Sequence, residues 1–362
     1  MFTFNSFEKL SFEKNYTIMF DFSEATLETC SIHGVGNIGK EEPLYLSEES
    51  LHVEEAFTGE ILLKYFTHSF KREQYYHFSQ EENTVFQQIR AVFENNDELL
   101  KASQLLAQHL HENSLHPRIK GGEFFMAKLN GCKVDGRTVS AIGLFKSENK
   151  DVFLKVFPKS KGYGAGGDNG ININKLDKGC LVFNMEKDEG YKVLVVDNAN
   201  FGEEAKFWKE DFLKVKPAAD DYNITANFMK LTKGFCEDVL TEEHQIDKKD
   251  QLIIKNKALD YFKNNETFNT KDFAAQVIEE PQVIEAFHQY KQNFFRKHDM
   301  EPVDEVEISD QAVKNSGRFL KSVLKLDKNF HVYVHGRHDF IEKGFDEEKD
   351  MHYYRLFFKN EQ

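Results

Sequence analysis

The chain has 362 residues, which is enough for two or three domains and a sizeable buried core. Aromatic residues make up 14% of the chain, and this excludes a disordered protein. A formal net charge of −14 excludes a small basic protein that coats DNA indiscriminately, so any contact with nucleic acid must come from a local patch.

The sequence carries no sign of a membrane segment or a targeting segment. No run of 18 uncharged apolar residues occurs, and the first twenty residues lack the basic start and the unbroken apolar stretch of a signal peptide. We therefore expect a cytoplasmic protein that makes no membrane contact. Four well-separated cysteines form no C-x-x-C pair, so we expect buried free thiols.

The first 110 residues contain two stretches that predict helices. Residues 2–32 mix helix and strand signals and predict neither. His33–Asn37 predicts a turn, and Ser47 is a candidate N-cap for a helix that follows. Apolar residues then recur at intervals of three and four in Glu54–Phe70 and again from Asn83 to Leu110, with a break at Asn95–Asp97. The second pattern fits two helices or one broken helix.

The middle of the chain predicts an antiparallel meander. Its three apolar runs are Gly122–Leu129, Val139–Phe145 and Val152–Phe157, separated by turns at Asn130-Gly131, Asp135-Gly136 and Glu148–Lys150. A glycine-rich stretch, Gly162–Gly170, predicts a flexible connection. Cys180–Met185 and Tyr191–Val196 then predict a hairpin, so we expect a sheet of five or six strands.

The C-terminal part predicts a change of composition after a boundary at Pro217–Asp221. Four stretches have helical spacing, and they are Thr225–Leu240, Leu252–Phe262, Thr270–Ile278 and Pro281–Phe295. The last fifty residues return to strand signals at Phe319–Leu326, Phe330–Val334 and Met351–Phe358. We therefore predict an α+β protein. Residues 1–218 form an N-terminal domain of helices packed on a mostly antiparallel sheet, and residues 219–362 form a helical segment that ends in a small antiparallel sheet.

Two basic islands contrast with the acidic total. Ten lysines and arginines face four acidic residues between Ser114 and Lys161, for a local charge of +6, and the window from Lys314 to Arg337 carries +5. Polyanions are attracted by local fields more than by totals. The islands are equally compatible with a phosphate-binding surface and with ordinary solvated surface.

Three patterns suggest chemistry, but each has a more ordinary interpretation. G-x-G-x-x-G at Gly162 is followed by an extended run instead of the helix that a phosphate loop requires. The histidines His331, His335, His338 and His352 have no acidic partner at a familiar ligand spacing, so no metal site is predicted. Glu148-x-Lys150 resembles the acidic-x-Lys element of metal-dependent nucleases, but it falls in a predicted turn. No cofactor is predicted, and an enzyme is not favoured.

Several motifs together resemble one protein family. They are His33–Asn37, Tyr65-Phe66 with Phe70-Lys71, Ser114–Phe124, Ile142–Glu148 and Leu326–Tyr333. In order and spacing they resemble the bacterial nucleoid-associated protein family known as NdpA or YejK, from about His33 to the C-terminus. This resemblance implies a cytoplasmic protein located with the nucleoid that binds DNA or DNA-associated enzymes. For the best-known members it also implies a functional interaction with topoisomerase IV.

We therefore expect a non-enzymatic nucleoid-associated protein that contacts DNA phosphates through its basic islands. The residues predicted to make these contacts are Arg118, Lys120, Lys128, Arg137, Lys146, Arg318, Lys321 and Lys325. One alternative is a protein-interaction module that acts on topoisomerase IV or another DNA enzyme without touching DNA. A second alternative is a metal-dependent nuclease that uses Glu148 and Lys150.

Overall fold

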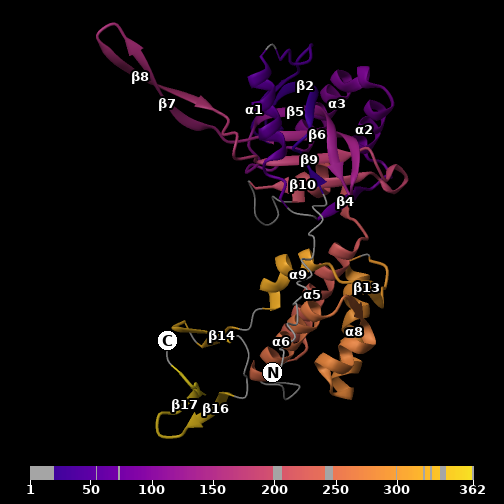
Figure 1. Cartoon of the computed structure of the whole chain (residues 1–362), viewed down its shortest axis with the longest axis vertical. Helices are drawn as coiled ribbons and strands as arrows, with labels where there is room; N and C mark the ends of the chain where they lie inside the picture. The colour runs from indigo at the N-terminus through magenta and orange to yellow at the C-terminus, as the bar shows by residue number, and fades with distance from the viewer. Residues whose placement is uncertain are drawn as a thin grey trace, which may run out of the picture. The chain divides into compact units, whose positions relative to one another are not determined.

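The computed structural model divides the chain into two compact units, residues 1–218 and 219–362, and each is described by itself (Figure 1). The residues that the structure describes are 20–53, 55–71, 74–198, 206–240, 248–298, 300–320, 323–326, 328–334 and 340–360.

The first unit is built on one antiparallel sheet. Among the described residues this sheet has nine strands in the order β11-β4-β10-β9-β6-β5-β2-β3, with β1 also paired to β5. The strands are β1 Phe20–Asp21, β2 Thr26–Val35, β3 Leu44–Tyr45, β4 Tyr75–Phe78, β5 Gly122–Val134, β6 Arg137–Ser147, β9 Lys178–Phe183, β10 Lys192–Asp197 and β11 Val215–Pro217.

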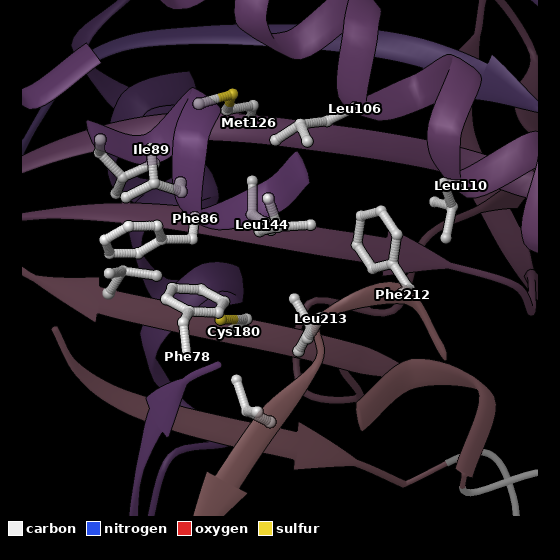
Figure 2. Packing of buried hydrophobic residues seen from close by; sticks show 14 of the residues in the cluster. Phe78, Phe86, Ile89, Leu106, Leu110, Met126, Leu144, Cys180, Phe212 and Leu213 are labelled. Atoms are coloured by element: carbon white, nitrogen blue, oxygen red, sulfur yellow. The ribbon is translucent and has the colours of Figure 1, made fainter. Parts of the chain in front are cut away.

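Both faces of the sheet are buried because side chains alternate along its central strands. Phe124 and Met126 of β5 point into one core, and Phe125 and Ala127 point into the other. The first core lies under helices α2 (Thr84–Glu94) and α3 (Leu99–Asn113), as Figure 2 shows. Of the two alternatives that the sequence left open, two helices are found, since a short 3-10 turn, η2 (Asn96–Glu98), separates α2 from α3.

Helix α1 (Ala56–Thr67) covers the opposite face. Its Phe66 ring stacks on Phe145 of β6 with centroids 4.2 Å apart, and meets Phe125 of β5 edge-on at 5.6 Å. The predicted cap at Ser47 is wrong, because the helix begins only at Ala56. Ser47 Oγ instead donates to the Ile32 carbonyl at 2.5 Å.

The predicted meander is only partly correct. β5 and β6 form the expected hairpin around the Asp135-Gly136 turn, but Asn130-Gly131 is a bulge within β5, where the register shifts, and not a turn. The third run leaves the sheet. As β7 (Asp151–Lys159) it pairs only with β8 (Gly162–Gly170), so the glycine-rich stretch is a strand and not a flexible connection. We call this separate ribbon, residues 151–170, the arm (Figure 1).

The other predictions for the first unit are partly correct. The hairpin β9–β10 is confirmed. The sheet exceeds the expected five or six strands because β1, β2, β4 and β11 were not predicted, and His33–Val35, predicted as part of a turn, ends β2. After β10, a π-helical turn, η4 (Phe207–Phe212), places the buried Trp208 in the first core. A 3-10 turn, η1 (Ile38–Lys40), and another, η3 (Lys187–Glu189), complete this unit.

The second unit packs helices around phenylalanine. Its helical elements are α5 Asp221–Asp238, α6 Lys248–Asn264, α7 Thr270–Phe273, η6 Ala274–Ile278, α8 Pro281–Lys297, α9 Asp310–Ser316 and η7 Gly317–Leu320. All four predicted helical stretches are confirmed. Phe228 and Phe268, with centroids 4.0 Å apart, lie in a core that also includes Phe235, Phe262, Phe273, Phe287 and Phe295. Asp220 begins α5 by accepting the backbone N–H of Asn223 at 2.8 Å.

The second unit also contains small two-stranded antiparallel sheets, and the α+β class is confirmed. β12 (Thr267–Asn269) pairs with β13 (Glu305–Glu307). β14 (Val323–Leu326) pairs with β15 (Phe330–Tyr333), and β16 (Ile341–Asp346) with β17 (Met351–Leu356). The predicted strand at Phe319–Leu326 starts late, since η7 occupies its beginning. None of the helices in the described ranges is long and apolar enough to cross a membrane.

Because His33 is buried, we expect the stability of the protein to depend on pH. His33 Nε2 lies 2.8 Å from Ser103 Oγ, which itself donates to the Leu100 carbonyl, and His33 Nδ1 accepts the Ser47 backbone N–H at 3.0 Å. This arrangement requires neutral imidazole. Burial lowers the pKa of His33 and of the half-buried His109.

Because the folded-state pKa lies below the unfolded value of about 6.5, the unfolded chain takes up the proton first as the pH falls. We expect the free energy of unfolding to fall below about pH 6.5, by at most about 1.4 kcal/mol per pH unit for each such histidine. Urea unfolding between pH 7.5 and 5 measures this. His33→Gln should make the dependence shallower, whereas His68→Gln, at an exposed position, should leave it unchanged. Equal slopes in all three proteins would contradict the assignment.

Candidate functional site

Three of the motifs that carry the family resemblance meet around one loop, residues 114–121, between α3 and β5. The side chain of Asn37 donates from Nδ2 to two carbonyls of this loop, those of His116 and Ile119, both at 2.8 Å. The nearby Lys40 ammonium lies 3.3 Å from the Ile119 carbonyl. The backbone of the loop is therefore fixed to the segment that follows β2.

Lys146 holds the same loop from the other side. Its ammonium donates to the Lys120 carbonyl at 2.7 Å and lies 3.2 Å from a carboxylate oxygen of Glu148. The Lys146 side chain is fully buried, and this burial lowers the pKa of its ammonium group, while the Glu148 carboxylate acts in the opposite direction. Lys146 therefore supports the loop from inside and does not present its charge to solvent.

The Glu148 carboxylate connects Lys146 to a second buried ion pair. Lys178 Nζ lies 3.8 Å from Glu148 and 3.0 Å from Asp197, and all three side chains are almost completely buried. Two lysines and two carboxylates thus balance their charges where β6, β9 and β10 lie next to one another. Burial of ions requires such pairing, because an uncompensated charge in the interior is very unfavourable. We call Lys146, Glu148, Lys178 and Asp197 the buried quartet.

A close backbone approach explains the glycine that begins β5. A Cβ atom added at Gly122 would lie 1.7 Å from the Ser147 carbonyl oxygen, and one at Gly121 would lie 2.8 Å from a carboxylate oxygen of Glu42. Only glycine therefore fits at Gly122, where β5 begins against the end of β6. The Lys120-Gly121-Gly122 sequence places the basic loop directly beside the turn that leads to the arm.

Arg118 and Lys120 are exposed on this fixed loop. Lys120 Nζ donates to Asn149 Oδ1 at 2.7 Å, in the turn between β6 and the arm. Lys40 is also exposed, and Lys150 pairs with Glu123 at the start of β5. We call the exposed side chains of Lys40, Arg118 and Lys120 the loop site. Lys40 was not predicted, because it lies about eighty residues away in sequence and outside the basic island.

The remaining predicted residues of the first island do not join the loop site. Lys128 is buried, with its ammonium 2.5 Å from Asn96 Oδ1 and 3.1 Å from Glu28. Arg137 is exposed but begins β6, at the opposite end of the β5–β6 hairpin. Strand β5 has 13 residues, which at about 3.3 Å per residue separates Arg137 from Lys120 by about 40 Å. The first island is therefore not one surface.

The second island lies in the second unit and is only partly described. Arg318 is exposed on η7. Lys321 lies outside the described residues, and Lys325 belongs to β14 by its backbone. The contribution of these three residues to DNA contact remains a prediction.

The side chains of the acidic-x-Lys element point to different partners. Glu148 contacts the two lysines of the buried quartet, while Lys150 contacts Glu123. The carboxylate and the ammonium therefore do not converge on one exposed site, as a nuclease centre would require. The prediction of a hairpin turn at 148–150 is wrong, because β6 and β7 do not pair. These residues instead form a loop in which Asp177 Oδ2 accepts both the Glu148 and the Asn149 backbone N–H, at 2.6 and 2.9 Å.

The predicted histidine pattern does not form a cluster within the described residues. His331 and His352 are exposed on different hairpins, and His335 and His338 lie outside the described residues. A different group, His77, Glu186 and Glu189, brings three potential ligand atoms within 4.8 Å of one another. Glu186 hydrogen-bonds with His77 at 2.8 Å and lies 3.5 Å from the Lys192 ammonium, so its carboxylate connects β4 to the β9–β10 hairpin.

The buried quartet predicts a large loss of stability when one carboxylate is removed. We expect Glu148→Gln to lower the free energy of unfolding by about 3–5 kcal/mol, because two buried lysines lose their shared partner. Urea unfolding monitored by Trp208 fluorescence measures this. As a matched control, Glu24→Gln breaks the exposed pair with Lys133 and should lower the free energy of unfolding far less, because water screens an exposed pair. Similar losses in both variants would show that the quartet contributes no more than surface pairing does.

Comparison with known proteins supports the resemblance that the motifs suggested. Residues 31–351 match the family described as "Nucleoid-associated protein YejK", and this match includes the loop site, the buried quartet and the arm. A search of curated proteins finds no match for this chain. Because the family match covers most of the chain, the protein belongs to the nucleoid-associated protein YejK family.

Proposed function

We propose that this member of the nucleoid-associated YejK family is a cytoplasmic, non-enzymatic protein that contacts DNA phosphates through the loop site. The observation that carries the proposal is the presentation of Arg118 and Lys120. Both side chains are exposed on a backbone that Asn37 and Lys146 fix through three hydrogen bonds of 2.7–2.8 Å. A fixed backbone lowers the entropy lost when the two cations meet a phosphate.

The charge distribution explains how an acidic protein can bind DNA locally. The total of −14 opposes nonspecific coating of the polyanion. At the loop site, in contrast, cations gather on one edge of the first unit, and Lys40 adds a third charge beside the Ile119 carbonyl. Phosphate contacts of this kind position a protein on the duplex without reading bases, so the proposed binding tolerates different sequences.

Charge reversal at the loop site tests the proposal. We expect Arg118→Glu with Lys120→Glu to weaken binding to a labelled duplex by at least about tenfold at low salt, and to reduce the slope of log affinity against log salt by about two. Fluorescence anisotropy at several salt concentrations measures both quantities. The matched control is Lys133→Glu with Arg137→Glu, which changes the net charge equally at the other end of the β5–β6 hairpin.

The outcome of this comparison is informative in either direction. Loss of binding in the loop-site variant alone supports a local contact. Equal loss in both variants would mean that only net charge matters, and unchanged binding in the loop-site variant would exclude the loop site as the DNA contact.

A protein-interaction module that acts on topoisomerase IV is the alternative, and a cleft favours it. The cleft of about 660 Å³ lies between β2 and α1, and its lining includes Thr26, Glu28 and Gly59. Within the described residues, Thr26–Thr29 have a strand partner on one side only, β5, so their other edge lies open to an extended peptide.

Filling the cleft distinguishes the two functions. Gly59→Arg places a long side chain in the cleft and improves helix propensity in α1, so it should not unfold the protein. If the module function is correct, purified topoisomerase IV should be retained by the immobilised wild-type chain in the absence of DNA, and Gly59→Arg should lose it. Retention by neither protein would remove this alternative, whatever the result for DNA.

A further inference from the structure

The arm has no structural support beyond its own two strands. Among the described residues β7 and β8 pair only with each other, over nine residue pairs from Asp151–Gly170 to Lys159–Gly162. A two-stranded ribbon by itself is marginally stable in water, and stability normally requires a third strand or a packed face. We therefore expect another surface to pack against the arm.

One face of the arm is covered by its own aromatic side chains. Phe153 and Phe157 lie on this face, and their rings cross to glycines of the opposite strand. A Cβ atom added at Gly164 would lie 2.6 Å from the Phe157 ring, and one at Gly170 would lie 3.2 Å from the Phe153 ring. This packing of aromatic rings over cross-strand residues explains why glycine is found at Gly164 and Gly170.

The other face is apolar and uncovered. Its large side chains are Val152, Leu154, Val156 and Tyr163, which are 79%, 75%, 62% and 80% exposed, compared with 42% and 44% for the two phenylalanines of the covered face. Their cross-strand neighbours are uncharged, and they are Asn169, Gly167, Ala165 and Pro158. Within the arm, all of which the structure describes, this face carries no Asp, Glu, Lys or Arg side chain.

We propose that this uncharged face of the arm packs against the same face of a second copy of the chain. In a two-fold interface each surface meets itself, so a charged face would bring like charges together, whereas a face without ionic side chains does not. DNA is a poorer occupant of this face, because protein–DNA interfaces are strongly positive. This inference does not depend on the proposed function, which uses the loop site.

The charged side chains of the two strands lie on the covered face, together with Phe153 and Phe157. Asp168 pairs there with Lys155 at 2.5 Å, and Asp151 pairs with Lys175 at 3.1 Å. These charges point away from the proposed interface, so the contact between two arms rests on the apolar side chains of the other face.

The size of the arm sets the expected strength of the dimer. Strands of nine residues are about 30 Å long, and a two-stranded ribbon is about 10 Å wide, so each copy offers a footprint of about 300 Å². Stable interfaces bury about 800 Å² on each partner. We therefore expect a dimer that dissociates on dilution and not an obligate dimer.

Site-directed cysteines test which face meets the second copy. The four native cysteines are buried, and burial raises the pKa of Cys30, Cys132 and Cys236 to about 12, so an introduced exposed thiol reacts selectively. We expect Leu154→Cys or Val156→Cys to form a covalent dimer under mild oxidation or with a short bifunctional maleimide. Lys155→Cys, on the covered face of the same strand, should remain monomeric.

Mass measurement without labels provides a second test. Light scattering after size-exclusion chromatography of the wild-type chain should show mass that rises from one copy toward two with concentration. Leu154→Glu should stay at one copy, because it buries like charges against each other in the dimer. Lys155→Glu, with the changed charge on the other face, should behave as the wild type does.

Three results would overturn the proposal. They are a single-copy mass up to the highest soluble concentration, equal cross-linking at positions 154 and 155, and cross-linked dimers in which Leu154→Glu has no effect. If the wild-type chain stayed monomeric and Leu154→Glu lost affinity for duplex DNA, the arm would be a DNA-binding element and the second copy would be excluded as its occupant.

Discussion

The first unit depends on the compensation of charge inside the sheet. Lys146, Glu148, Lys178 and Asp197 are almost fully removed from water, so each ion requires its neighbours to remain charged without a large loss of stability. This constraint reaches the surface because the Lys146 ammonium also binds the Lys120 carbonyl. The charge balance inside the sheet and the position of the loop that carries the exposed cations therefore depend on the same side chain, Lys146.

Distant motifs meet here for a physical reason. Asn37 satisfies two carbonyls of the loop after α3, and β6 satisfies another through Lys146. A loop of irregular backbone has no ladder to pair its polar groups, so side chains from other elements must do so. Much of what identifies the family in this chain therefore belongs to the support of one loop, whose exposed residues include Arg118 and Lys120.

Local patterns predicted local structure well. The helices α1, α2, α3, α5, α6 and α8 follow from apolar spacing, and the β9–β10 hairpin follows from its turn. The sequence could not show which strands share a sheet, because pairing between distant strands depends on tertiary packing. The third run of the meander was therefore assigned to the wrong sheet. Burial was equally hidden, since Lys128 and Lys146 look like any basic residue of the island, yet lie inside. Lys40 was missed because nothing local links it to Arg118.

The two-residue repeat of the arm limits how its length can vary. Asp151 and Gly170 are cross-strand neighbours at the point where the ribbon leaves the unit, so residues could be added or removed beyond them without disturbing the sheet. Side chains alternate between faces, however, and a change of one residue in each strand would exchange the faces of everything farther out. The reach of the arm can therefore change only in steps of two residues per strand, about 7 Å, if its covered and uncovered faces are to be kept.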